Sequence, residues 1–400
     1  MIIKRDILSV IDKHLAKEDA LLIIGPRQAG KTTVLHQVEN NLKKDNDCFF
    51  VNLEDPEYLQ LLNKSPKNLF EIFSINLNKK TYVFVDEVQY LKDPSNFIKF
   101  FVDEYKGRIK IIASGSSAFY LDSKFKDSMV GRKILITMFP LSFKEFFFFK
   151  NNEVIEDFKK ISLSQKEKIR QAYFEYLVFG GYPKVVLAET KEEKIENLKE
   201  IAYSYIKKDI YEYRLRQDET FYKLFKILAS QVGGMVNSFE LANTLDVSKT
   251  VIKHYLSVMQ KSFHVFVIHP FFNNVRKEIT KMPKIYFIDN GLRSFFLNDF
   301  KGYLERPDSG QMLENDVFRE FLNINNQEDI KFWRTSDGKE IDFIIKGKEA
   351  FEVKAKVANL KENNFKVFLD NYKIKPKIIS LEEKEMSNGC EIIKPWDILS

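Results

Sequence analysis

The sequence predicts an α/β protein: a parallel β-sheet with crossover helices, then a helical segment, a unit of three short helices and two strands, and a mixed α/β terminal domain. Two observations lead to this fold class. Residues 301–400 contain the pattern helix, strand, strand, turn, strand, helix, strand, strand. The first third alternates apolar runs with helical sequence, as parallel strands joined by helices do; the runs are LLIIG at 21, CFFVNLED at 48, TYVFVDE at 81, KIIASGSS at 110 and ILITMFPLS at 134.

The composition is that of a soluble globular protein. With 44% hydrophobic and 30% charged residues among 400, the chain has room for two or three domains. The apolar stretch PLSFKEFFFF at 140 is much shorter than the roughly 20 residues of a membrane span. The first residues lack the apolar core of a secretion signal, so we expect a cytoplasmic protein without membrane contact.

Cysteine count and charge limit the possible functions further. The two cysteines, Cys48 and Cys390, are too few for a disulfide framework or a cysteine zinc site. The formal net charge of +6 is mild for this length, so it allows an anionic partner but does not require one.

Changes in sequence character predict four domains. We expect a sheet core at 1–142, an aromatic-rich helical lid at 143–218, a winged helix at 219–300 and the terminal domain at 301–400. The winged helix is predicted because three short helical runs, two of them with serine N-caps at Ser238 and Ser248, precede two β-rich runs.

A phosphate-binding loop follows the first strand. Residues 25–32, GPRQAGKT, fit the pattern G-x-x-x-x-G-K-S/T and open the helical run TTVLHQVENNL. Backbone amides at a helix N-terminus cradle phosphate oxygens, Lys31 reaches the β and γ phosphates, and Thr32 ligates Mg²⁺. We therefore expect a P-loop ATPase core with ATP and Mg²⁺ as cofactors, held by Gly25, Pro26, Arg27, Gln28, Ala29, Gly30, Lys31, Thr32 and Thr33.

The strand YVFVDE at 82 supplies the acidic half of this site. We expect Asp86 to hold the Mg²⁺ and its water shell, and Glu87 to polarise the attacking water, which favours hydrolysis over binding alone. Ser114 and Ser116 end the next strand, where their hydroxyls either sense the γ-phosphate or cap a helix.

Arg132 follows a glycine in the loop before the fifth strand. One hypothesis makes it an arginine finger, a catalytic residue that stabilises transition-state charge in this site or in that of a neighbouring subunit. The alternative is an ordinary surface arginine.

Several segments together closely resemble prokaryotic AAA-type ATPases whose C-terminal half is a nuclease-like domain of unknown function. The segments are GPRQAGKTTVL, YVFVDEVQYL, ASGSSAFYL, the GR before PLSFKEF, and FGGYPKV, and the resemblance continues through IKKDIYEY and LENDVFREFL to FEVKAK. It implies an ATP-binding core, a winged-helix connector and a terminal domain similar to PD-(D/E)XK nucleases, with a restriction-endonuclease-like fold.

The run EIDFIIKGKEAFEVKAK at 340–356 predicts a charged strand pair. The strand period of two places Glu352 and Lys354 on one face, and a three-residue loop at 346–348 places Asp342 opposite Glu352. Because facing carboxylates repel, Lys354 or a bound divalent cation must compensate. We expect Asp342 and Glu352 to hold Mg²⁺ while Lys354 positions or deprotonates water.

Glu314 lies at the edge of the apolar stripe of the helical run MLENDVFREFL. The resemblance implies that it adds a further metal-side carboxylate. On the residues alone it is an ordinary solvated glutamate. For the whole group of carboxylates there is an alternative to a metal site. The domain could keep the nuclease fold without cleaving nucleic acid, and Lys354 and the carboxylates would then form only a salt-bridge network.

Basic residues of the winged helix are candidate DNA contacts. Lys249, Lys253 and His254 lie on the helix that we expect to be the recognition helix. A wing-like loop carries a richer patch for phosphate contacts, made of Arg276, Lys277, Lys281 and Lys284. Such a unit also serves as a rigid protein connector.

Three functions remain open on the sequence. The first is an ATP-dependent enzyme that acts on nucleic acid through a metal-dependent nuclease-like domain. The second is a regulatory ATPase switch whose inactive nuclease-like domain binds a protein or nucleic acid partner. The third is a DNA translocase that works as a homo-oligomeric ring.

Overall fold

The computed structural model describes residues 5–116, 131–155, 158, 161–213, 218–272, 276, 278, 281–359, 362–383, 386–387 and 389–399. Its contacts divide the chain into two compact units. Unit 1 comprises Met1–Pro140 with Lys261–Phe263, and unit 2 comprises Leu141–Gln260 with His264–Ser400. The helices of the predicted lid fall in unit 2, and the four-domain division stays a prediction.

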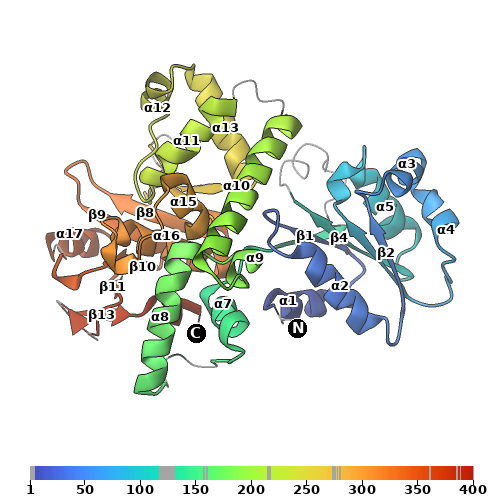
Figure 1. The fold of residues 1–400 in the computed structure, drawn as a ribbon, viewed down its shortest axis with the longest axis horizontal. Helices are drawn as coiled ribbons and strands as arrows, with labels where there is room; N and C mark the ends of the chain where they lie inside the picture. The colour runs from blue at the N-terminus through green and yellow to red at the C-terminus, as the bar shows by residue number, and fades with distance from the viewer. Residues whose placement is uncertain are drawn as a thin grey trace. The chain divides into compact units, whose positions relative to one another are not determined.

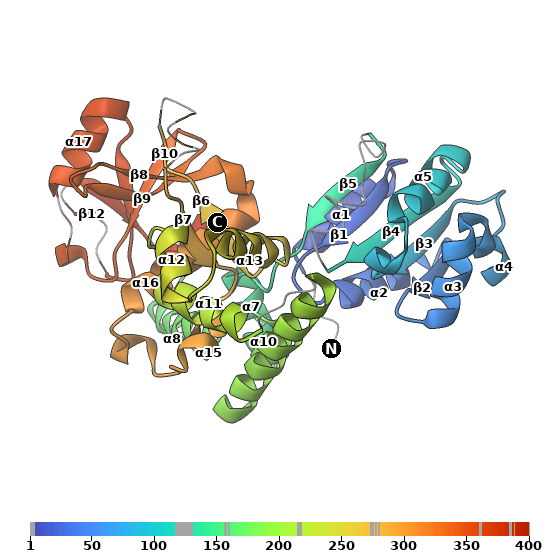
Figure 2. The same ribbon diagram turned by 90° about the horizontal axis from the view of Figure 1, so that it is seen from above.

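Unit 1 is built on a five-stranded parallel sheet of order β2-β3-β4-β1-β5. Figure 2 shows the strands side by side in this order. All five are the strands that the sequence predicts: β1 (Ala20–Ile24), β2 (Asp47–Asn52), β3 (Thr81–Asp86), β4 (Ile109–Gly115) and β5 (Lys133–Thr137). Because β4 lies between β1 and β3, residues that follow these three strands meet at one edge of the sheet.

Helices cover both faces of this sheet (Figure 1). On one face α1 (Ile7–Leu15) and α2 (Lys31–Leu42) bury Ile11 and Leu35 against Phe84. On the other, α3 (Pro56–Lys64), α4 (Leu69–Ile72) and α5 (Pro94–Glu104) pack against β1, β3 and β4. The central strands β1, β3 and β4 are therefore buried on both sides, which explains their continuous apolar runs.

Unit 2 begins with helices that have clear start signals. Ser142 with Glu145 and Ser162 with Gln165 form capping boxes, in which each side chain bonds the other's backbone amide. The helices are α7 (Phe143–Asn151), α8 (Leu163–Phe179), α9 (Pro183–Val186) and α10 (Lys191–Tyr213). Between α8 and α9, Gly181 N–H donates to the Asp289 carboxylate at 2.7 Å. A Cβ on Gly180 would collide with the same carboxylate, which explains the glycine pair in FGGYPK.

Three helices and a hairpin follow, as expected for residues 219–300. They are α11 (Asp218–Ser230), α12 (Ser238–Thr244), α13 (Lys249–Lys261) and the antiparallel strands β6 (Val265–Ile268) and β7 (Lys284–Phe287). Ser248 caps α13 through a 3.3 Å bond from Val251 N–H. The predicted cap at Ser238 is wrong, because α12 starts at Ser238 and the Asn237 side chain accepts its first amides. The helix α15 (Asn290–Leu297) comes after the hairpin.

The terminal part contains a mixed six-stranded sheet of order β12-β13-β11-β10-β9-β8. Phe321 packs against Phe343 and Phe351, and Phe368 packs against Trp333, so two helices contribute to its core. The helices are α16 (Ser309–Ile324) and α17 (Glu362–Tyr372). The strands are β8 (Ile330–Arg334), β9 (Glu340–Ile345), β10 (Glu349–Val353), β11 (Pro376–Ile379), β12 (Met386–Ser387) and β13 (Cys390–Ile393).

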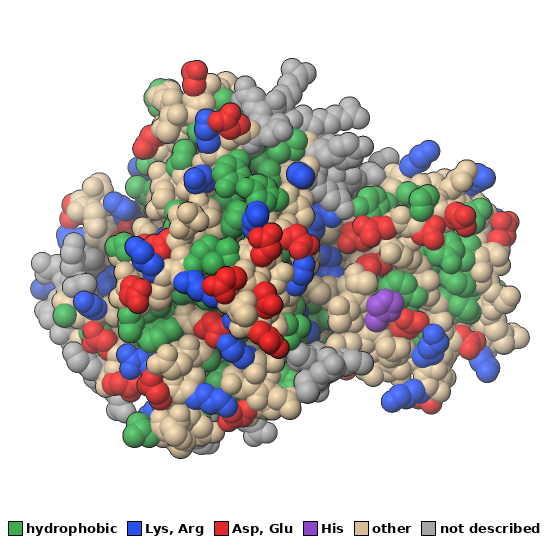
Figure 3. Space-filling view, viewed as in Figure 1, with side chains coloured by type: hydrophobic (Ala, Val, Ile, Leu, Met, Phe, Trp, Pro, Cys, Tyr) green, Lys and Arg blue, Asp and Glu red, His purple; other side chains and the backbone are tan. Residues whose placement is uncertain are grey.

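The described helices include none that is both long and apolar enough to span a membrane. Basic and acidic side chains are interspersed over the face drawn in Figure 3. This mixture agrees with the mild net charge of +6.

Candidate functional site

The loop between β1 and α2 has glycines where the backbone needs them. A Cβ on Gly25 would lie 1.9 Å from the carbonyl oxygen of Met138, which follows β5. Gly30 has a φ of 97° and is the N-cap of α2. The first glycine therefore allows close packing against β5, and the second allows the left-handed turn that starts the helix.

Lys31 is held against this loop. Its side chain is buried, and Nζ donates to the carbonyl oxygens of Gly25 at 3.0 Å and Pro26 at 2.8 Å. The ammonium is thus positioned inside the loop, at the N-terminus of α2, where amides and the helix dipole attract phosphate.

Thr32 and Asp86 meet at the carboxyl edge of the sheet. The Thr32 hydroxyl donates to Asp86 Oδ2 at 2.7 Å, and the Ser114 hydroxyl donates to Asp86 Oδ1. Asp86 is 3% exposed. A hydroxyl and a carboxylate this close beside the phosphate loop fit Mg²⁺, which binds one or two protein oxygens together with nucleotide phosphates and water. Ser114 lies inside β4 and bonds the carboxylate, so it does not cap a helix.

Glu87 lies next to this pair in a left-handed backbone conformation, with a φ of 56°. Its amide donates to the Ser114 hydroxyl at 3.1 Å, and its carboxylate accepts a bond from the Gln89 side chain. Gln89 is buried and also donates to the Ser116 hydroxyl at 2.9 Å. The helix-cap alternative for Ser116 concerns residues after it that lie outside the described part of the chain.

Sequence reasoning missed Gln89, which joins the predicted base to a predicted sensor serine. The only signal in the sequence was that Gln89 is a polar residue in DEVQYL, between the acidic pair and an aromatic residue.

Arg132 lies at the amino ends of the strands, opposite the carboxyl ends where Thr32 and Asp86 meet. Its carbonyl accepts from Ala20 N–H, and the next residue pairs with Ala20 at the amino end of β1. The phosphate loop follows Ile24 at the carboxyl end of the same strand. The guanidinium forms an ion pair with Asp103 at 2.7 Å. This placement disfavours a finger that serves this chain's own site, and a finger for a neighbouring subunit stays a prediction.

The terminal domain brings its predicted carboxylates together. Strands β9 and β10 pair Glu349 with Ile345 and Phe351 with Phe343, which is the register that the sequence predicted. Asp342 and Glu352 follow in that register, just beyond the last ladder pair, and Asp342 Oδ2 accepts from Val353 N–H at 2.9 Å. Both carboxylates are buried.

Lys354 is placed as expected beside this pair. Its Nζ lies 2.6 Å from Glu352 Oε1 and 4.0 Å from Asp342 Oδ2. The other oxygen of Glu352 has no hydrogen-bond partner among the residues that the structure describes. Burial, and then the nearby Asp342 charge, raise the pKa of Glu352 to about 8 although Lys354 opposes the shift.

Lys284 corrects the predicted wing patch. We expected a phosphate-binding surface lysine, but its side chain is 1% exposed and its Nζ lies 3.2 Å from Glu314 Oε1 and 3.4 Å from Asp342 Oδ1. It also forms an ion pair with Glu340. Strand β7 therefore points this lysine into the carboxylates of α16 and β9. Of the other patch residues, Arg276 and Lys281 are exposed, and Lys277 lies outside the described residues.

Glu314 is a half-buried member of this group, with a side chain that is 16% exposed, and not a solvated helix residue. It accepts from the Tyr286 hydroxyl at 2.7 Å, and a Cβ on Gly233 would lie 2.8 Å from its Oε1. Burial raises the pKa of Glu314 to about 7, against the opposing effect of Lys284. We call Glu314, Glu340, Asp342, Glu352, Lys284 and Lys354 the charge cluster.

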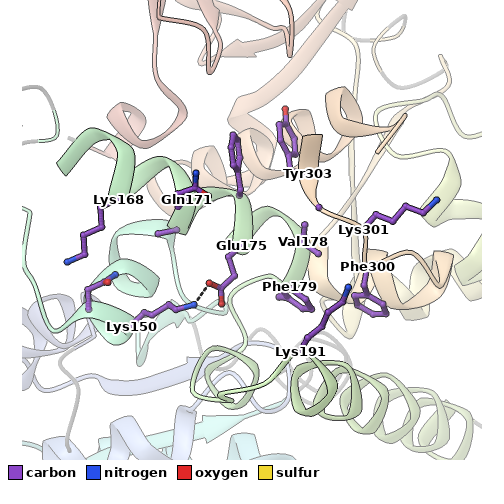
Figure 4. Close-up of a pocket in the computed structure, with 14 residues that line it drawn as sticks. Lys150, Lys168, Gln171, Glu175, Val178, Phe179, Lys191, Phe300, Lys301 and Tyr303 are labelled. Carbon is purple, nitrogen blue, oxygen red and sulfur yellow. Dashed lines mark hydrogen bonds and ion pairs between the residues drawn. The ribbon is translucent and has the colours of Figure 1, made fainter. Parts of the chain in front are cut away.

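A separate groove in unit 2 combines lysines with aromatic rings (Figure 4). It has a volume of about 710 Å³ and is lined by Lys150, Lys168, Lys191, Lys301, Phe174, Phe179, Phe300 and Tyr303, among others. Phe179 stacks on Phe300 with ring centroids 5.9 Å apart. Lys150 pairs with Glu175, as the dashed line in Figure 4 marks, and Lys168 pairs with Glu153.

Family models match three segments of the chain. Residues 17–147 match an AAA domain, residues 170–301 a domain of unknown function (DUF8612), and residues 309–397 another domain of unknown function (DUF4143). The first match includes the phosphate loop, Asp86 and Glu87. Residues 17–147 are therefore similar to AAA domains, and the parallel sheet and phosphate loop of unit 1 agree with that similarity.

The chain is similar over most of its length to uncharacterized proteins. One from Methanocaldococcus jannaschii is 29% identical over 363 residues, which cover 88% of this chain and 77% of the relative. One from Haemophilus influenzae is 27% identical over 398 residues, covering 94% and 93%. One from Mycobacterium tuberculosis is 24% identical over 348 residues, covering 86% and 71%.

Solved structures give weaker likenesses. The replication initiator DnaA bound to AMPPCP and single-stranded DNA has a TM-score of 0.30 at 17% identity, covering 63% of this chain and 86% of that one. A katanin structure has a TM-score of 0.32 at 15% identity, covering 64% and 82%. At these TM-scores, nothing about the ligands or assembly of those proteins carries over to this chain.

Proposed function

We propose that this chain binds and hydrolyses ATP in unit 1 and acts as a regulatory switch whose nuclease-like terminal part does not cut. The observation that supports hydrolysis is the meeting of Thr32, Asp86 and Ser114 beside the lysine-bearing loop. In this arrangement the loop amides and Lys31 bind phosphates, and Thr32 and Asp86 hold Mg²⁺. A Mg²⁺ ion held by these two residues would supply positive charge beside the phosphates.

Glu87 is the residue that we assign to the attacking water. Its carboxylate bonds Gln89, whose side-chain amide also reaches the Ser116 hydroxyl at 2.9 Å. We therefore propose that Gln89 and Ser116 position the base, while Glu87 itself orients and polarises water.

Equilibrium binding of ATP to the full chain tests the first step. We expect wild type to bind MgATP and Lys31→Ala to lose at least tenfold in affinity, because the variant lacks the ammonium that meets the β and γ phosphates. Equal affinity of the two proteins would contradict the proposed site.

Metal-dependent cleavage of nucleic acid is the second candidate function. The convergence of Glu314, Asp342, Glu352 and Lys354 favours it, since these residue types support phosphodiester hydrolysis when they hold Mg²⁺. The position of Lys284 disfavours it, because an ammonium already contacts three carboxylates. Incubation of single- and double-stranded DNA and RNA with Mg²⁺ or Mn²⁺ distinguishes the two functions: we expect no cleavage that depends on Lys354.

Nucleic acid is the partner that the surface of unit 2 favours, and we place its contact in the lysine-aromatic groove. Single strands are bound by positive grooves with aromatic rings on which bases stack. Lys191 and Lys301 line the groove, and neither has an ion-pair partner among the residues that the structure describes. The exposed Lys249, Lys253 and His254 on α13 form the competing site, as a winged helix would use them.

A further inference from the structure

We infer that the ammonium of Lys284 is the resident cation of the charge cluster, so the cluster binds no divalent metal while this lysine is in place. The inference concerns unit 2 alone and does not depend on ATP hydrolysis. It also corrects the expected metal site at Glu314, Asp342 and Glu352.

The contacts of Lys284 match the donor capacity of an ammonium group. Three carboxylates from two elements converge on one Nζ: Glu314 from α16, and Glu340 and Asp342 from β9. An ammonium offers three hydrogen-bond donors and no acceptor. The stem lies against the ring of Phe332, with Nζ 5.5 Å from the ring centre, which adds a cation–π contact. Each donor therefore has a carboxylate to meet.

A divalent metal does not fit the same group. Mg²⁺ needs oxygen ligands at about 2.0–2.1 Å in octahedral geometry, with several waters. An ion shared by Glu314 and Asp342 would have to occupy the space of Nζ, which lies 3.2 Å and 3.4 Å from their oxygens. Among the described residues, no set of three or more histidine, cysteine, aspartate or glutamate side chains is arranged to hold a metal ion.

The surroundings of Lys284 fix it in this position. Its strand β7 pairs with β6, and the next residue but one, Tyr286, stacks on Phe318 at 4.5 Å and donates to Glu314. The backbone of Gly233 covers Glu314, and Gly233 N–H bonds Ile285 O at 2.9 Å. Burial acts to lower the pKa of Lys284, but Glu314, Asp342 and Glu340 hold that pKa well above its ordinary value, so the lysine stays charged.

Arg334 and Lys354 complete the charge balance. Arg334 pairs with the second oxygen of Glu340 at 2.8 Å, and Lys354 pairs with Glu352. The three cations Lys284, Lys354 and Arg334 thus meet four carboxylates, so most of the negative charge is compensated by side chains of the protein. Such a group is held together without an added ion.

Mn²⁺ titration of the nucleotide-free full chain, followed by electron paramagnetic resonance, tests the inference. The proteins are wild type, Asp342→Asn, Lys284→Met and Lys284→Met/Asp342→Asn, with Lys281→Met as a control that removes a nearby exposed lysine. We expect wild type, Asp342→Asn and Lys281→Met to bind equal numbers of Mn²⁺. Lys284→Met should bind one more, and the double variant should lose that extra ion.

Two results would overturn the inference. One is a Mn²⁺ ion that binds to the wild-type protein but not to Asp342→Asn. The other is a Lys284→Met protein with the wild-type circular dichroism spectrum that gains no Mn²⁺. If Lys284→Met does not fold, the comparison of wild type with Asp342→Asn still decides, because neither protein removes the lysine.

Discussion

The Thr32 hydroxyl donates a 2.7 Å hydrogen bond to the Asp86 carboxylate, which joins two segments 54 residues apart in sequence. Both groups are Mg²⁺ ligands by chemistry, and their contact marks where the ion would bind. We predict that Mg²⁺ tightens ATP binding to wild type by about tenfold or more, and that Thr32→Ala removes most of this gain because the variant lacks one ligand. Titration with fluorescent ATP, with and without Mg²⁺, measures the gain. If Mg²⁺ tightens ATP binding to Thr32→Ala as much as to wild type, Thr32 is not a Mg²⁺ ligand.

Gly25 should tolerate no side chain. A Cβ there would lie 1.9 Å from the Met138 carbonyl oxygen, and neither atom can rotate away, because the oxygen is backbone and the backbone fixes the position of the Cβ. We predict that Gly25→Ala destabilises unit 1 by more than about 3 kcal/mol. Gly310→Ala is the matched control, because nothing lies within 4 Å of the added carbon in a helix that prefers alanine. Thermal unfolding compares them, and similar melting temperatures would refute the predicted clash.

Arg132→Ala tests the remaining finger hypothesis. Since Arg132 pairs with Asp103 at the amino edge of the sheet, we predict unchanged ATP hydrolysis per chain in dilute protein. Asp103→Asn is the control, because it breaks the same ion pair and keeps the arginine. A loss in Arg132→Ala alone that grows with protein concentration would support a finger supplied to a neighbouring subunit. A loss at every concentration would contradict the placement of Arg132 outside its own site.

Asp308 should stabilise unit 2 in a pH-dependent way. Burial acts to raise its pKa, but hydrogen bonds from Arg306 and the charge of Arg293 outweigh this and lower the pKa to about 2. The folded state therefore binds fewer protons than the unfolded state between pH 2 and 4, so the contribution is complete above pH 4 and is lost as pH falls toward 2. We predict that Asp308→Asn costs about 2 kcal/mol at pH 7, at about 1.4 kcal/mol per pKa unit.

Urea unfolding of wild type and Asp308→Asn across pH 2–7 measures this effect. The difference between the proteins should shrink in the acid range. A difference that stays constant down to pH 2 would show that the ion pairs with Arg306 and Arg293 do not carry the stabilisation.

The groove lysines should govern binding of single-stranded oligonucleotides. We predict that Lys191→Gln/Lys301→Gln weakens binding and lowers the slope of log affinity against log salt by roughly 1.4, about 0.7 for each lysine. Lys249→Gln/Lys253→Gln removes the same charge from α13 and should change binding little. Fluorescence anisotropy over a salt series compares the two. Loss of binding in the α13 variant instead would move the contact to the surface of α13.

The fold around the phosphate loop could be predicted from the sequence because its information is local. The apolar strands and the GPRQAGKT loop are continuous in sequence, and parallel strands place Asp86 and Ser114 at the same edge. The register of β9 and β10 was equally readable, since loop length and the strand period fix it.

Lys284 could not be assigned correctly for the opposite reason. In KIYFID it begins a strand, where a lysine is typical of an exposed wing. Its burial arises from Glu314 and Asp342, which lie 30 and 58 residues further along the chain. The motif around Arg132 likewise could not show which site a finger would serve, because strand direction decides which end of the strands the residue reaches.

Steady-state phosphate release from MgATP by the full chain tests the central claim most directly. The account predicts turnover by wild type and none by Lys31→Ala. It also predicts that Glu87→Gln binds ATP with wild-type affinity but turns over at least about 100-fold more slowly, because it lacks the base that polarises water. Equal rates for wild type and Glu87→Gln, or turnover that survives Lys31→Ala, would contradict it.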